Sequence, residues 1–137
     1  MPAAKPKTLG DRLKWAVRAY ARHQAALGQV AVTAHDEALY LLLRTLDLPL
    51  DSQAAVLKRR LTAEENARVE EVFRRRLEEH VPAAYLTREA YLGDLRFYVD
   101  ERVIIPRSYF LELLPAIAEL MGNKPVKRVV DVCTGSG

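Results

Sequence analysis

The sequence has few of the features that mark secreted, membrane or metal-binding proteins. Its single cysteine, Cys133, cannot form a disulfide within the chain. No apolar run reaches the roughly 18 residues of a membrane helix, and the first residues lack the apolar stretch of a secretory signal. The histidines, His23, His35 and His80, lack metal-ligand spacing with one another or with the cysteine. We therefore expect a cytoplasmic protein that holds no metal.

Charge of one sign is not in large excess either. The 21 basic and 18 acidic residues give a formal net charge of +3, so any attraction to phosphate must be local. Half of the residues are apolar and 28% are charged, which is typical of a globular protein and not of a disordered one. Composition by itself does not indicate a nucleic-acid-binding protein.

Helical periodicity fills the first eighty residues. Apolar residues recur at three- and four-residue spacing, and Thr33 with Asp36 and Thr62 with Glu65 resemble capping boxes. The predicted helices run from Leu9 to Gly28, from Thr33 to Leu48, from Asp51 as the cap to Arg60, and from Ala63 to about His80. The buried candidates of the last helix are Ala67, Val69, Val72, Phe73 and Leu77. Packed by such stripes, these helices would form a small bundle.

The pattern changes after Val81-Pro82. Residues 90–92 and 95–99 alternate and carry aromatic side chains around the turn Gly93-Asp94, which predicts a β-hairpin, and residues 103–105 are expected to be extended. A further helix is expected from about Arg107 to Met121, with a bend or restart at Pro115. A helix that leads into an apolar strand and a glycine turn indicates the start of an α/β domain.

The last residues carry the chemistry. The mainly apolar run of residues 129–132 predicts a buried strand. The motif that begins within it, Asp131-x-Cys133-x-Gly135-x-Gly137, has the spacing of the acidic-x-Gly-x-Gly-x-Gly loop of class I methyltransferases. Cys133 stands in the first glycine position. Glycines in such a loop let the backbone approach a nucleotide-like ligand closely. Taken alone, the same residues are equally compatible with an ordinary tight turn.

The segment before this motif resembles a known linker. Residues 82–87 (PAAYLT) and 97–107 (FYVDERVIIPR) are similar to the hairpin linker of the glutamine methyltransferases that modify protein translation factors. The resemblance implies a mainly α fold: a helical N-terminal bundle, a β-hairpin linker and the truncated start of a Rossmann-like methyltransferase domain that binds S-adenosylmethionine. The corresponding ranges are 1–8 as a flexible tail, 9–81 as a helical substrate-recognition domain, 82–106 as the linker and 107–137 as the start of the cofactor-binding domain.

Two branches of this family differ in the motifs quoted above. The release-factor branch usually has Pro and acidic residues after Ile-Pro-Arg, and Gly at the position of Cys133. In this sequence Ser108 follows Ile-Pro-Arg, and Cys133 replaces the glycine. Both features resemble the branch that methylates a glutamine of large-subunit ribosomal protein L three. The segments 36–38 and 48–51 also resemble that branch. We therefore favour that branch. The release-factor enzyme and a non-enzymatic helical protein-binding module remain the alternatives.

The resemblance also implies site residues. Gly135 and Gly137 would pass close to the amino-acid end of S-adenosylmethionine, Asp131 would order the loop or accept from the cofactor's ammonium group, and Thr134 and Ser136 would donate hydrogen bonds. Phe97 would either pack against the adjacent domain or contact the cofactor. The family's catalytic Asn-Pro-Pro-Tyr motif is not in this sequence, so no catalytic residue is named and this chain alone is expected to be inactive.

Several residues have an ordinary structural explanation beside a functional one. The basic clusters would contact ribosomal RNA during assembly or, more commonly, form solvated faces of helices and loops. These clusters are Lys58–Arg60, Arg74–Arg76, and Lys124 with Lys127 and Arg128. Trp15 is expected in the core, with a substrate-docking patch as the alternative. Oligomeric state does not follow from the sequence.

Overall fold

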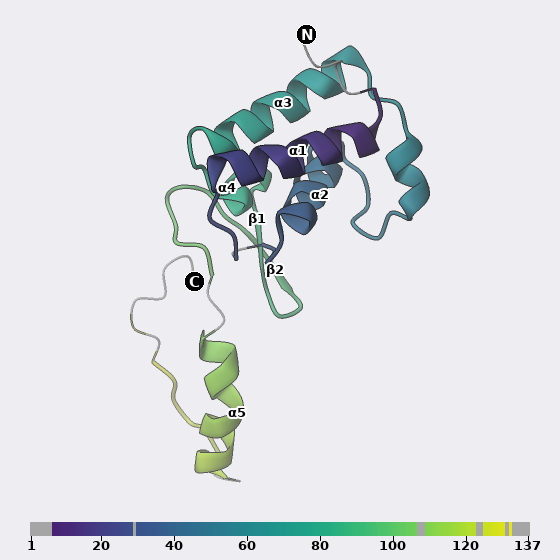
Figure 1. Cartoon of the computed structure of the whole chain (residues 1–137). Helices are drawn as coiled ribbons and strands as arrows, with labels where there is room; N and C mark the ends of the chain where they lie inside the picture. Colours follow the sequence, from purple (N-terminus) through teal and green to yellow (C-terminus); the bar gives the residue numbers. More distant parts are fainter. Residues whose placement is uncertain (1–6, 29, 107–108, 123–124, 131, 133–137) are drawn as a thin grey trace. The chain divides into compact units, whose positions relative to one another are not determined.

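The part of the chain that the structure describes is mainly helical and has one two-stranded antiparallel sheet (Figure 1). The computed structural model describes residues 7–28, 30–106, 109–122, 125–130 and 132. In chain order the elements are α1 (Leu9–His23), α2 (Ala34–Thr45), the 3-10 helix η1 (Ala54–Lys58), α3 (Ala63–Leu77), α4 (Ala83–Thr87), β1 (Glu89–Leu92), β2 (Leu95–Tyr98) and α5 (Tyr109–Met121). They form two compact units, residues 1–87 and 88–137.

The three long helices of the first unit begin at threonine caps. The predicted box at α3 is confirmed: Thr62 accepts from the backbone N–H of Glu65, and the Glu65 carboxylate accepts from the backbone N–H of Thr62. α1 has an equivalent box between Thr8 and Asp11. At α2, Thr33 accepts from the N–H of Asp36 but donates its hydroxyl to the Asp36 carboxylate, so the predicted box is half formed. Each cap contributes about 1 kcal/mol.

The predicted helix ends were less accurate. α1 ends at His23 and not at Gly28, because Gln24 takes up a left-handed conformation with φ 48°. α3 ends at Leu77 and not at His80, which has φ 58°. Asp51 is not a cap, because Ser52 turns back onto the carbonyl of Pro49 and the following helical segment is the short η1, which has no side-chain cap. Each correction reflects a turn that the apolar spacing does not specify.

The core of the first unit lies between α1, α2 and α3. Phe73 is at its centre, with Trp15 and Tyr20 packed edge-on against it at centroid distances of 5.8 and 6.2 Å. Burial of an apolar side chain of this kind contributes about 1.5–3 kcal/mol. Val69 and Leu77 are buried as predicted, and Val72 is half-buried, whereas Ala67 is exposed. Trp15 is half-buried and packs on the core, as expected.

The start of α1 is joined to a distant segment of the same unit. Thr8 and Arg60 form an antiparallel bridge, flanked by hydrogen bonds from Leu9 N–H to Arg59 O and from Leu61 N–H to Lys7 O. Residues 7 and 8 are therefore held by the backbone between η1 and α3. Gly10 lies at the same place, where an added Cβ would be 3.1 Å from the carbonyl oxygen of Leu57.

The second unit contains the predicted hairpin. β1 and β2 pair antiparallel with Leu92 opposite Leu95, and Gly93 in the turn has φ 58°. α5 contains Pro115 and is followed by Gly122 with φ 56°. Neither residues 103–105 nor residues 125–130 lie in a strand. An extended segment needs a hydrogen-bonded neighbour to become a strand, and the two strands found in the described residues pair with each other.

The predicted linker, residues 82–106, contains both α4 and the hairpin. α4 packs against α2 and α3 within the first unit, and the Thr87 hydroxyl lies 3.0 Å from the Tyr40 hydroxyl. The division between the two units falls after Thr87.

Candidate functional site

Most of the predicted cofactor residues lie outside the described part of the chain. They are Asp131, Thr134, Gly135, Ser136 and Gly137. Cys133 and Arg107 also lie outside it. Phe97 is the predicted cofactor residue whose surroundings are described, and it lies in β2.

Phe97 belongs to the apolar face of the hairpin. It is paired with Ala90, and because side chains alternate along a strand it shares its face with Leu92, Leu95 and Val99. Val99 is 1% exposed and Leu95 is 61% exposed, and the Phe97 ring between them is half-buried. A half-buried ring retains surface with which it can pack on a planar or apolar group. This geometry is compatible with either of the two roles predicted for Phe97.

The opposite face of the hairpin is polar and aromatic, and the sequence analysis did not identify it. The Tyr91 hydroxyl donates to the Glu89 carboxylate at 2.9 Å, and the Arg96 guanidinium lies 3.9 Å from the same oxygen. Tyr98 is 61% exposed on this face. The two-residue alternation of residues 89, 91, 96 and 98 is the signal that would have revealed it. Tyrosines are enriched at protein interfaces, and Tyr91 and Tyr98 are both exposed on this face.

A tight ion pair follows the hairpin. The Arg102 guanidinium donates to both carboxylate oxygens of Asp100 at 2.6–3.1 Å, and the Arg102 backbone N–H donates to one of them. These hydrogen bonds lower the pKa of Asp100 to about 2. Asp100 is therefore ionised at neutral pH and fixes the turn at residues 100–102, within the segment that carries the family resemblance.

A buried polar cluster in the first unit was also not predicted. Glu37 Oε1 accepts from the Tyr20 hydroxyl and from Arg76 Nε, both at 2.6 Å, and Arg76 also donates to the backbone carbonyl of Ala26. Burial, and then the hydrogen bond to Glu37, raise the pKa of Tyr20. Glu37 lies one helical turn before the apolar residue Leu41, and this spacing could have indicated that Glu37 faces the core. The cluster joins α1, α2, α3 and the segment after α1, so its role is structural.

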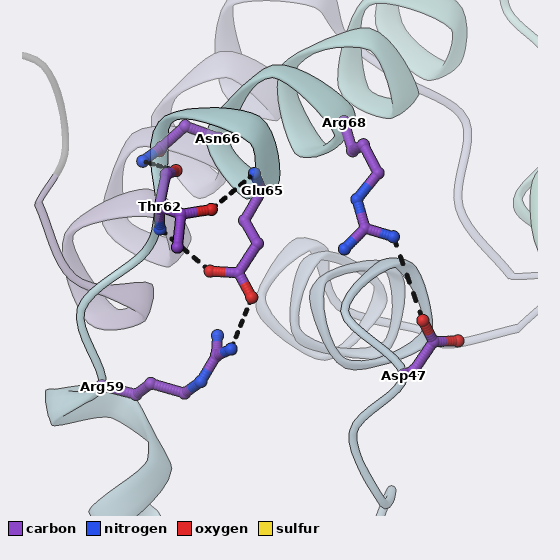
Figure 2. A network of polar contacts seen from close by, with 6 residues as sticks. All are labelled: Asp47, Arg59, Thr62, Glu65, Asn66 and Arg68. Atoms are coloured by element: carbon purple, nitrogen blue, oxygen red, sulfur yellow. Dashed lines mark hydrogen bonds and ion pairs between the residues drawn. The ribbon is translucent and has the colours of Figure 1, made fainter.

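A second polar network surrounds the start of α3 (Figure 2). The Arg59 guanidinium donates to Glu65, and the Asn66 side-chain amide donates to the carbonyl of Thr62 at 3.0 Å. The Arg59 hydrogen bond lowers the pKa of the Glu65 carboxyl. Asn66 in turn accepts from Arg12 at 2.9 Å, which links α3 to α1. The network positions α3 against α1 and the segment after η1, although Nε of Arg12 and Nη1 of Arg59 are buried without a hydrogen-bond partner among the described residues.

The described residues contain no group of three or more His, Cys, Asp or Glu side chains placed to hold a metal ion. The helices described above include none that is both long and apolar enough to cross a membrane.

The comparisons with known proteins point to one kind of relative. The chain is 44% identical over 95% of its length to a protein of Neisseria gonorrhoeae named ribosomal protein uL3 glutamine methyltransferase. It is 47% identical over 96% of its length to the protein of the same name from Burkholderia pseudomallei, and 44% identical over 96% to that from Bordetella pertussis. The chain spans 44%, 43% and 45% of the lengths of these relatives. No protein-family model matches it.

Proposed function

We propose that this chain, a homologue of the ribosomal protein uL3 glutamine methyltransferases over nearly its whole length, forms the N-terminal portion of such an enzyme. The complete enzyme would transfer a methyl group to the side-chain amide nitrogen of a glutamine in ribosomal protein uL3, in the cytoplasm. The observation that carries the proposal is 44–47% identity, over at least 95% of the chain, to several proteins with that name. The chain spans less than half of their length, so the activity belongs to a longer protein.

S-adenosylmethionine is the cofactor that this reaction requires, because its sulfonium carries an activated methyl group. We assign its amino-acid end to the loop of Asp131, Thr134, Gly135, Ser136 and Gly137, in a domain of Rossmann-like fold. Phe97 is the part of the proposed site at which the fit can be examined. Its ring is half-buried on an apolar hairpin face, which leaves surface for packing against the cofactor.

The contribution of the protein to catalysis would be mainly positional. The amide nitrogen is a poor nucleophile because its lone pair is delocalised. It must form the new N–C bond as the S–C bond breaks, and it then loses a proton. Holding the reacting atoms in line contributes about 7–11 kcal/mol at best. A chain with part of a cofactor site cannot hold them, so these 137 residues alone would show no turnover.

The helical unit would recognise the substrate, and the hairpin would connect it to the catalytic domain. The buried Tyr20–Glu37–Arg76 cluster holds α1, α2 and α3 together, and the hydrogen bond from Arg12 to Asn66 joins α1 to α3 a second time. A rigid unit of this kind suits the presentation of a protein substrate.

Calorimetry with S-adenosylmethionine tests the proposal directly. The 137-residue chain and the protein extended through its natural downstream sequence are titrated in parallel, and the extended protein is then incubated with uL3 and analysed by peptide mass spectrometry. We expect binding and methylation of one uL3 glutamine by the extended protein alone. Absence of cofactor binding by both proteins would refute the cofactor assignment and leave a helical protein-binding module. Methylation of a Gly-Gly-Gln peptide instead would indicate the release-factor branch.

A further inference from the structure

A row of three cations runs along the outer face of α1. Lys14, Arg18 and Arg22 are all exposed and follow one another at four-residue spacing, so they lie on one side of the helix. Successive members are separated by about 6 Å along the helix axis, which is comparable with the spacing of phosphates along a nucleic-acid strand. The opposite side of α1 is buried through Leu13, Ala16 and Tyr20.

These cations are largely free of carboxylate partners. Among the described residues, no hydrogen bond or ion pair involves the side chain of Arg18 or Arg22. Asp11 is the one acidic residue of α1, and its pKa is lowered chiefly by its hydrogen bonds with Thr8 and to a smaller extent by the Lys14 ammonium. Asp11 is engaged at the cap, where it accepts from the N–H of Thr8.

The basic cluster of α3 differs in this respect. Arg74 donates to Glu71 at 2.7 Å and lies 2.6 Å from Glu79, and Arg75 lies 3.7 Å from Glu79. Arg76 is buried against Glu37. The arginine run most conspicuous in the sequence is therefore neutralised within the unit. Within the first unit, the α1 row differs from this run because its exposed cations remain available to an external anion.

Further cations lie at the beginning of α1. Arg60 forms the bridge to Thr8, and Lys58 ends η1, which packs against α1. Both side chains are exposed. They lie on segments that contact the beginning of the same helix. We call Lys14, Arg18 and Arg22 the α1 basic surface.

We propose that the α1 basic surface binds the phosphate backbone of RNA. An acidic protein segment fits less well, because protein interfaces depend on buried aromatic or apolar anchors, and Trp15 and Tyr20 of α1 are packed against Phe73. Binding would not depend on base sequence, since phosphate contacts carry no sequence information. The choice of RNA as the anion rests in part on the proposed function. A ribosomal protein substrate is assembled with RNA, so an enzyme that acts on it would meet RNA.

Salt-dependent RNA binding tests this inference on the full 137-residue chain. The test variant is K14Q/R18Q/R22Q. The matched control is R68Q/R74Q/R75Q, which removes the same charge from two exposed and one half-buried arginine of α3 that have carboxylate partners. Titrations use a labelled RNA duplex of arbitrary sequence at several salt concentrations, with circular dichroism to compare helix content. The charge-conserving K14R/R18K/R22K variant tests whether any loss is due to charge.

We expect the test variant to lose affinity on the order of tenfold or more at low salt, with a salt slope shallower by about two to three. The control and the charge-conserving variant should bind as the unaltered chain does. Equal losses in test and control variants, or no RNA binding by the unaltered chain, would overturn the proposal. The proposal would also be overturned, in favour of an acidic protein partner, if poly-glutamate bound as tightly as RNA and lost affinity in the test variant. No cofactor is present, so either result leaves the methyltransferase proposal to its own test.

Discussion

Arg76 Nε lies 2.6 Å from Glu37 Oε1, and both side chains are almost completely buried, at 6% and 1% exposure. The pair joins α2 to α3, and the Tyr20 hydroxyl on the same oxygen adds α1. A buried charge is tolerated when its partners are all in place and is costly when one of them is removed. This cluster therefore makes the packing of the three helices mutually dependent.

Replacement of Arg76 by Met should destabilise the protein strongly. It leaves the Glu37 carboxylate buried without its counter-ion, which costs about 3–5 kcal/mol. The matched control is R74M, because Arg74 is exposed and pairs with the exposed carboxylates of Glu71 in α3 and Glu79 just after it, so its loss should change stability little. Urea unfolding followed by circular dichroism measures both. Similar unfolding midpoints for the two variants would contradict the structural role of the cluster.

The buried Tyr20 should make stability depend on alkaline pH. Its pKa is raised in the folded protein above the ordinary value of 10.0, so the folded state retains the proton where the unfolded chain loses it. Stability from this group is fully present below pH 10 and declines as the pH rises above it. Unfolding free energies measured from about pH 8 to about pH 11 should show this decline.

Replacement of Tyr20 by Phe provides the comparison for that measurement. It should cost about 1–3 kcal/mol at neutral pH, because Glu37 loses a buried donor. The decline above pH 10 should become shallower than in the unaltered protein. An unchanged pH dependence in Y20F would show that other groups cause it.

Loss of the α3 capping box should have a smaller and separable effect. T62A removes the acceptor for the Glu65 N–H and should lower the free energy of unfolding by about 1 kcal/mol. T62S retains the hydroxyl and should restore most of it. Thermal unfolding of the three proteins checks this, and equal stability of T62A and T62S would argue against the cap.

Phe97 tests the proposed cofactor contact in the extended protein. F97A should weaken S-adenosylmethionine binding on the order of tenfold, because aromatic packing is lost. L95A is the control, since Leu95 lies on the same hairpin face but is 61% exposed. Calorimetry distinguishes the two. Equal affinities for F97A and L95A would assign Phe97 to packing alone.

Local signals in the sequence predicted local structure well. Thr62 with Glu65 located the start of α3, and Gly93-Asp94 between alternating residues located the hairpin turn, because each depends on residues within a few positions. The predicted end of α1 was wrong by several residues, because no residue type in the sequence marked Gln24 as a left-handed position.

Contacts between distant residues were the part that the sequence could not supply. Glutamate and arginine are usually exposed, and the burial of Glu37 and Arg76 depends on how α2 and α3 pack together. The sequence also could not show which basic residues have ion-pair partners. Arg74 pairs with Glu71 on its own helix, whereas Arg18 has no partner among the described residues. Of the candidate cofactor site, the motif spacing gave residues 131–137, and that assignment stays a prediction.

The bridge between Thr8 and Arg60 constrains how the protein folds as it is synthesised. Thr8 leaves the translating ribosome early, but the backbone that holds it follows only when Arg60 and Leu61 have emerged. Until then α1 has its cap and can pack against α2, but it lacks its contacts with η1 and α3, so part of its apolar side stays uncovered. The packing of α1 is therefore completed only after synthesis has passed Arg60.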